Sequence, residues 1–246
     1  DHHARWKEIS DKLADQIRRL SGDVAVACAF VCYTGPFDVE FRGAVARERL
    51  LKDCAARQIP HSADFSIRSF LGDEIKLREW TLGGLPDDEM SMQNVILATR
   101  AQRWPFFVDP QGQGQNWVKI SEAANGLRVT SFHDQFFREK LEDAMAFGQP
   151  LLLQNVDGDL DPIVAPVLAK KTQKSGRGFK IALAHKECEY SDCFRLYLAC
   201  NLSNPHLPAK VFGDLTVINF TITTEGLEQW LLHRAMLTDW PEAEER

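Results

Sequence analysis

The feature that most limits the fold of this chain is a series of short apolar segments that alternate with helical patterns. The four clearest apolar segments are Pro105–Asp109, Leu151–Val156, Phe194–Cys200 and Leu215–Phe220, and the segment Leu127–Ser131 is also strand-like. Strands that are apolar on both faces and alternate with helices are typical of βαβ units in a parallel sheet. The pattern therefore predicts an α/β fold of the P-loop NTPase-like type, with a five-stranded parallel sheet and helices on both faces.

The residues before this pattern are predicted to be helical. Apolar residues recur at three- and four-residue steps from Trp6 to Leu20, which predicts an amphipathic helix over residues 5–20 that Gly22 ends. A second apolar helix over residues 24–33 would then start at Asp23 as its N-cap. A third helical pattern runs from Phe37 to about Arg57 and stops before Pro60.

These patterns suggest four segments along the chain. We expect an N-terminal helix, a helical lead-in, an α/β core and a C-terminal helix, which cover residues 1–22, 23–86, 87–224 and 225–246. Within the core, Lys170–Gly178 is expected to be a loop before one further strand, Phe179–Ala184.

Composition excludes several classes of partner. A net charge of −6 without a basic run argues against a nucleic-acid surface, because phosphate binding needs clustered Lys and Arg. The longest apolar stretch, Val24–Tyr33, is half the roughly 20 residues that a membrane-spanning helix needs. The six cysteines follow no C-x-x-C pattern, so we expect packed, reduced thiols and no metal site.

The loop after the first strand is where a nucleotide would bind in this fold. A phosphate-binding loop reads G-x-x-x-x-G-K-S/T: its backbone N–H groups and its lysine hold the phosphates, and its hydroxyl holds magnesium. The loop here lacks that lysine and hydroxyl, and Lys119 lies too far along the following helix to replace them. The degenerate loop consists of Pro110, Gln111, Gly112, Gln113 and Gly114, followed by Gln115-Asn116-Trp117.

The ends of two later strands carry neutral residues at positions that bind nucleotide or magnesium in active members of this fold. The third strand of such folds normally ends in an acidic pair that binds magnesium and polarises water. Here that position carries Gln154 and Asn155, which are neutral amides. Asn201 follows the fourth strand, at the place of a phosphate-sensing side chain, whereas Asp157, Asp159 and Asp161 fit a solvated loop in which Asp161 caps a helix. We therefore expect weak or no nucleotide binding, no bound metal, no catalytic residue and no hydrolysis.

Several stretches of the chain are similar in order and spacing to one protein family. Arg103–Gln113, with Trp117–Lys119 after it, resembles the fifth AAA+ module of dynein heavy chains. Trp104-Pro105 and Asn204-Pro205-His206 resemble axonemal more than cytoplasmic members. The other matching stretches are Tyr33–Phe37, Glu40–Arg42, Arg78–Trp80, Gly84–Pro86, Pro150–Val156, Leu160–Pro162, Phe194–Tyr197, Ser203–His206, Val217–Phe220 and Glu225–Glu228.

The resemblance implies a place and a role for the chain. It implies a unit of a single-chain motor ring, in contact with neighbouring AAA+ modules and itself without nucleotide, while ATP and magnesium act in other modules. It implies that the first helix follows the returning arm of the microtubule-binding stalk and the end of the fourth module. The helix from Glu225 would lead into a coiled-coil arm that props the stalk, so microtubules are reached only indirectly. The implied location is the cytoskeleton of a cilium or flagellum, with the cytoplasm as the alternative.

Two other functions stay open at this point. One is a nucleotidase with an unconventional site that uses Asn201 and Lys210. The other is a stand-alone binding scaffold of P-loop-like fold. A ring fragment should expose apolar partner surfaces, whereas a free-standing scaffold should not.

Overall fold

The structure is a computed structural model that describes residues 2–157, 160–176, 178–183 and 186–222, together with residues 224, 226–228, 231, 232 and 235. The chain divides into two compact units, residues 1–74 and residues 75–246. Most of the helix expected from Glu225 lies outside the described residues, as does Asp159. The four expected segments, with their bounds at 22, 86 and 224, stay predictions.

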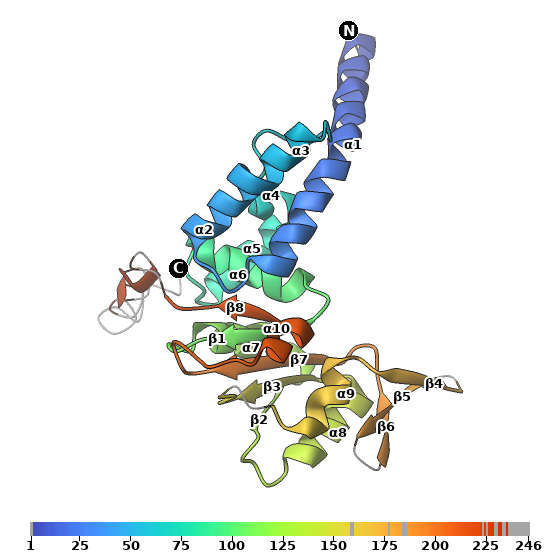
Figure 1. Ribbon diagram of the computed structural model, residues 1–246, viewed down its shortest axis with the longest axis vertical. Coiled ribbons are helices and arrows are strands. Elements are labelled where there is room, and N and C mark those ends of the chain that lie inside the picture. The colour runs from blue at the N-terminus through green and yellow to red at the C-terminus, as the bar shows by residue number, and fades with distance from the viewer. Residues whose placement is uncertain are drawn as a thin grey trace. The chain divides into compact units, whose positions relative to one another are not determined.

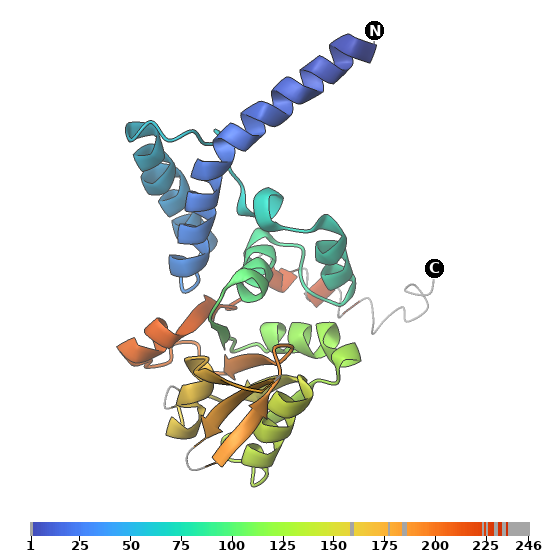
Figure 2. The ribbon, with the colours of Figure 1, turned by 90° about the vertical axis from the view of Figure 1, so that its right-hand side faces the viewer.

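The first unit is built around one long helix, α1 (His2–Tyr33), which runs through Gly22 without a break (Figure 2). The predicted helix end at Gly22 is therefore wrong. A Cβ atom at this position would lie 2.3 Å from the carbonyl oxygen of Pro60, so the glycine allows a close approach between two backbone segments. Asp23 is not an N-cap either, because its carboxylate accepts hydrogen bonds from the backbone N–H and the hydroxyl of Ser62, at 2.8 and 2.7 Å.

The predicted helix over residues 37–57 is confirmed, with a π-helical stretch in its middle. It consists of α2 (Val39–Ala44), the π-helix η1 (Val45–Leu51) and α3 (Lys52–Ala56). Asp38 caps α2 by accepting a 2.8 Å bond from the N–H of Phe41. The short helix α4 (Ile67–Leu71) follows, and Val26, Leu51 and Cys54 form a small core with α1.

A buried arginine closes the turn between α1 and α2. Arg42 is 0 % exposed and donates to the carbonyl oxygens of Thr34 and Gly35, at 3.1 and 2.8 Å. Thr34 and Gly35 directly follow the last residue of α1, and the Thr34 carbonyl also accepts a 3.1 Å bond from the N–H of Phe37. Burial lowers the pKa of the Arg42 guanidinium to about 10, against the opposing effect of Asp38.

The amphipathic pattern of the first helix is confirmed as a helix, but its apolar side chains are not buried in this chain. Trp6 is 69 % exposed and Ile17 is 71 % exposed. The large exposed apolar side chains on this part of α1, which we call the α1 stripe, are Trp6, Ile9, Leu13, Ile17, Leu20 and Val24.

The second unit contains the predicted five-stranded parallel sheet (Figure 1). Its strands in spatial order are β2 (Arg128–Ser131), β3 (Pro150–Gln154), β7 (Arg195–Cys200), β1 (Trp104–Val108) and β8 (Leu215–Asn219). All neighbouring pairs are parallel. In the centre of the sheet, Phe106 lies opposite Leu198 on one side and Val217 on the other. The fold class predicted from the alternating pattern is confirmed.

Helices cover both faces of this sheet. On one face Phe106 and Val108 pack with α8 (Phe137–Phe147) and α9 (Ala165–Leu168) in a large core. Phe107 points to the other face, because side chains alternate along a strand, and its ring lies 6.3 Å from that of Trp117 on α7 (Gln113–Ser121). The remaining elements are α5 (Glu74–Leu82), α6 (Glu89–Arg100), η2 (Ala123–Asn125), η3 (Pro162–Val164) and α10 (Ala209–Asp214).

A second, antiparallel sheet is inserted before β7, and the sequence predicted only one of its strands. It consists of β4 (Thr172–Ser175), β5 (Gly178–Leu183) and β6 (Lys186–Tyr190). The strand predicted at Phe179–Ala184 is β5, but residues 172–175, expected to be a loop, form β4. Both missed strands are mostly polar, and Cys188 is the one buried residue that β6 adds to the large core.

Candidate functional site

The loop between β1 and α7 lies at the carboxyl edge of the parallel sheet, where such sheets bind their ligands. Gly112 precedes α7 with φ 76°, a left-handed conformation that glycine adopts without steric strain. Gly114 lies in the first turn of α7, and a Cβ atom there would be 3.1 Å from the ring of Phe220. The two glycines thus allow a tight turn at Gly112 and close packing of α7 against Phe220.

The side chains that line the loop differ from those of an active phosphate-binding loop. When G-x-x-x-x-G-K-S/T is placed so that its second glycine is Gly114, the lysine falls on Gln115 and the Ser/Thr on Asn116. The first glycine of the pattern falls on Asp109. Asp109 was not among the predicted site residues, although its spacing from Gly114 could have revealed it.

Asp109 is a buried carboxylate at the start of the loop, with 0 % exposure. Its Oδ2 accepts a 2.9 Å bond from the backbone N–H of Gln115. The pKa of Asp109 lies above its ordinary value because burial raises it more than the N–H groups of Gln115, Gln113, Gly112 and Gly114 lower it. No hydrogen bond of standard geometry reaches Oδ1 within the described part of the chain. The carboxylate thus faces the backbone donors that a phosphate would face.

A chain of neutral amides joins α7 to the ends of β3 and β7. The amide of Gln154 donates to Oε1 of Gln115 at 2.5 Å, and Nε2 of Gln115 donates to Oδ1 of Asn201 at 2.8 Å. Asn201 in turn donates to Oδ1 of Asn155 at 2.6 Å. The structure therefore brings together the predicted strand-end residues Gln154, Asn155 and Asn201, and adds Gln115. We call these four residues the amide chain.

Among the residues that the structure describes, the side chains of Pro110, Gln111 and Gln113 in the β1–α7 loop make no hydrogen bond to the side chains of the amide chain. Pro110 is half-buried and Gln111 is exposed. Gln113 is buried, and its Nε2 has no hydrogen-bond partner in the described part of the chain. Lys119 is exposed one turn beyond Gln115 on α7. The cationic role of a phosphate-loop lysine is thus filled by neither Gln113 nor Lys119.

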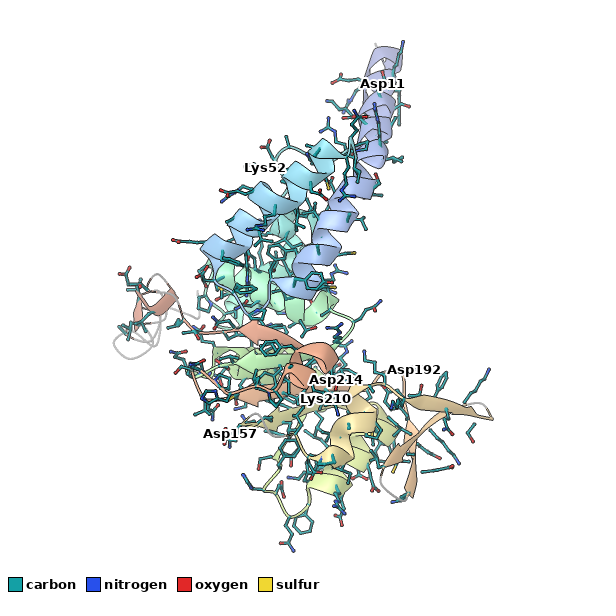
Figure 3. All side chains as sticks on the ribbon, in the orientation of Figure 1. Asp11, Lys52, Asp157, Asp192, Lys210 and Asp214 are labelled. Atoms are coloured by element: carbon teal, nitrogen blue, oxygen red, sulfur yellow. The ribbon has the colours of Figure 1, made fainter. Side chains whose placement is uncertain are left out.

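The acidic residues after β3 also lie away from the amide chain. Asp157 is exposed in the loop after β3 (Figure 3). Asp161 caps η3, accepting a 2.9 Å bond from the N–H of Ile163, as the sequence predicted. Lys210, the candidate cation of an unconventional site, is exposed on α10 (Figure 3). Asn201, its proposed partner in that site, already makes two hydrogen bonds in the amide chain.

The arrangement is poorly suited to phosphoryl transfer. That chemistry needs cations for the developing phosphate charge and a residue that orients the attacking nucleophile. The amide chain has neither a cation nor a carboxylate, and its amides hydrogen-bond to one another. All six cysteines are free thiols, and no group of three or more His, Cys, Asp or Glu side chains among the described residues is placed to hold a metal. No described helix is long and apolar enough to cross a bilayer.

Comparison with known proteins gives one family. Residues 78–246 match the family described as "ATP-binding dynein motor region". The chain is 42 % identical over 243 residues to the dynein gamma chain of the flagellar outer arm of Chlamydomonas reinhardtii, and 40 % identical over 240 residues to human dynein axonemal heavy chain 8. These matches cover 99 % and 98 % of the chain.

A further relative, human dynein axonemal heavy chain 1, is 37 % identical over 245 residues, or 100 % of the chain. The chain spans 5 % of the length of the first two relatives and 6 % of the third. The similarity thus covers this whole chain and a small part of each relative.

Proposed function

The chain belongs to the dynein heavy chains, as part of their AAA motor region, and we propose that it is the fifth AAA+ module of the motor ring and does not hydrolyse ATP. The choice of the fifth module rests on the resemblance of Arg103–Gln113 and Trp117–Lys119 to that module. The family description names ATP binding, which we assign to other modules of the same motor. The parent motor is then a microtubule-based ATPase, of which this unit is a mechanical part.

One observation supports the non-hydrolysing role above all others: the amide chain occupies the space in which the chemistry would take place. Gln115 stands at the lysine position, and its side chain is 5 % exposed and bonded at both ends. Gln154 and Asn155 stand at the acidic positions, and an amide cannot act as a general base. Magnesium binding, charge neutralisation and water activation would therefore all be absent.

Calorimetric titration of the purified chain with ATP and magnesium tests this proposal directly. We expect no saturable heat at micromolar ATP and no phosphate release. A thermal-unfolding series is an independent readout, because a ligand at 100 times its Kd should add about 2.7 kcal/mol of stability. Micromolar binding or turnover by the chain would refute the proposal.

The mechanical role that we propose is to transmit conformational change from the ATP-binding modules to the stalk. The β1–α7 loop keeps its fold while its chemistry is gone, which suits a rigid body in a hinge-and-shear movement. From the resemblance, we propose that α1 follows the returning arm of the stalk and that the segment from Glu225 leads into the supporting arm. A cross-link between this unit and its neighbour in the full motor should uncouple microtubule affinity from nucleotide state. Unchanged coupling would contradict this role.

The α1 stripe favours a ring fragment over a stand-alone scaffold. Six apolar side chains on one helix, Trp6 among them, are exposed in the isolated chain. Large exposed apolar surfaces indicate a binding partner. We propose that neighbouring segments of the same heavy chain cover the α1 stripe. By the similarity to axonemal and flagellar relatives, we further propose that the parent motor acts in the axoneme of a cilium or flagellum.

A further inference from the structure

The N-terminus of α7 is a place where an anion is favourable. The first N–H groups of a helix have no partner within the helix, and the helix dipole adds positive potential there. Phosphate-binding loops use this combination to hold a phosphate. In this chain the N–H of Gln115 already donates to a carboxylate, that of Asp109.

Asp109 is an unusual residue to find at this point. A fully buried carboxylate is costly unless hydrogen bonds or a cation compensate its charge. No Lys or Arg pairs with Asp109 in the described ranges, and the groups that favour its charged form are backbone N–H groups of the loop, from Gly112 to Gln115. In the phosphate-loop pattern the same position is a glycine, which leaves the space in front of these donors open.

We propose that the Asp109 carboxylate is a built-in anion that takes the place of a nucleotide phosphate in this loop. It keeps the loop and the start of α7 folded without ligand, and it excludes phosphate compounds. This inference rests on the proposed function, since it explains how a module without nucleotide can keep the loop conformation. The inference also goes beyond the proposed function, because it predicts that removal of the Asp109 side chain opens a binding site for an anion.

The test compares the full 246-residue chain with three variants. Asp109→Gly restores the pattern residue and empties the space, whereas Asp109→Asn keeps the volume of the side chain. Asp192→Gly is a matched control in the exposed turn between β6 and β7 (Figure 3). The probe is pyrophosphate, added to each protein in a calorimeter at fixed ionic strength.

We expect saturable binding by Asp109→Gly, at least about tenfold tighter than any binding by the wild type, a ratio that corresponds to 1.4 kcal/mol. The Asp192→Gly and Asp109→Asn variants should behave like the wild type. A folded Asp109→Gly variant that does not bind pyrophosphate would overturn the inference. Binding by Asp109→Asn as tight as that by Asp109→Gly would overturn it as well, since the side chain would then not occupy the anion position.

The Asp109→Gly variant can lose its fold when the anion is removed. In that event it is refolded with pyrophosphate or with sodium chloride of equal ionic strength. Recovery of the native circular dichroism spectrum with pyrophosphate alone supports the inference, and no difference between the two salts contradicts it. Binding of ATP by the wild-type chain would refute the proposed function, whereas failure of Asp109→Gly to bind pyrophosphate would leave that function standing.

Discussion

The phenol hydroxyl of Tyr197 donates a 2.7 Å hydrogen bond to Oε1 of Glu122, a carboxylate that is only 4 % exposed. Arg195 donates to the same oxygen at 2.9 Å, and Asn125 donates to Oε2 at 2.7 Å. Glu122 follows the last turn of α7, and Tyr197 and Arg195 lie on β7. The cluster therefore fixes the C-terminal end of α7 to the sheet, at the opposite end of the helix from Asp109.

The Tyr197–Glu122 bond predicts a loss of stability in alkaline solution. Burial, and then the Glu122 carboxylate, raise the pKa of Tyr197 well above its ordinary value of 10.0. The folded state therefore keeps the phenol proton above pH 10, where the unfolded state releases it. The free energy of unfolding should fall above about pH 10, by at most about 1.4 kcal/mol per pH unit from this group.

Urea unfolding between pH 8 and pH 11 measures this slope. Tyr197→Phe should lower stability by about 1–2 kcal/mol at pH 8, because Glu122 loses a donor, and should flatten the slope above pH 10. The control is Tyr33→Phe, at a tyrosine that is 75 % exposed, and it should keep the wild-type slope. Equal slopes in the wild type and Tyr197→Phe would contradict the prediction.

Gly22→Ala should destabilise the chain, against ordinary helix propensity. Alanine is normally about 1 kcal/mol better than glycine inside a helix. At this position, however, the new Cβ would lie 2.3 Å from the Pro60 oxygen, and an overpacked contact costs about 1–3 kcal/mol. Gly43→Ala is the control, because only the flexible end of Arg47 lies near that position, at 3.1 Å. Urea unfolding should show a loss for the first variant and no loss for the second.

Gln115→Leu should destabilise the sheet edge without creating a nucleotide site. Leucine fills a similar volume but leaves the amide of Gln154 and Oδ1 of Asn201 without their present partner. The expected loss is about 1–3 kcal/mol in the free energy of unfolding. Gln111→Leu, at an exposed loop position, should stay within about 0.5 kcal/mol of the wild type. Equal stability of the two variants would show that the amide chain contributes nothing.

Arg42→Met should weaken the first unit. The methionine retains much of the buried aliphatic volume, but the carbonyl oxygens of Thr34 and Gly35 lose the bonds from the guanidinium. We expect a loss of about 1–3 kcal/mol, and Arg42→Lys should recover only part of it, because an ammonium lacks the planar fork of donors. The matched control is Arg49→Met, at an exposed arginine. Denaturation followed by helical circular dichroism checks the prediction.

Strands β1, β3, β7 and β8 of the parallel sheet were predictable because burial on both faces leaves a nearly continuous apolar run in the sequence, whereas β2 is only partly buried. β1 shows this most clearly, since all five of its residues are buried. β4 and β6 carry no such run, because they are largely exposed and gain stability from pairing with β5. The continuity of α1 through Gly22 was not predictable either. Gly22 serves there as a contact point for Pro60, which is distant in the sequence.

Part of the candidate site was predictable because the apolar strands that lead to it are recognisable in the sequence. Gln154, Asn155 and Asn201 follow apolar strands, so a parallel sheet brings them to one edge. Asp109 was interpreted only as the residue that closes the first strand, because an aspartate before a proline is common in loops. Its role as an internal partner of the α7 N–H groups depends on the course of the backbone at Gly112 and Gly114.

The place of β1 in the middle of the sheet affects how this chain folds during its synthesis. β1 is the first strand of the sheet to leave the ribosome. Its two neighbours, β7 and β8, follow about 90 and 110 residues later. Such a large separation in sequence between paired strands slows folding. Until then the edges of an apolar strand stay unpaired and prone to aggregation. We therefore expect the edges of β1 to need cover, by early packing of α6 and α7 or by a chaperone, until β7 and β8 have emerged.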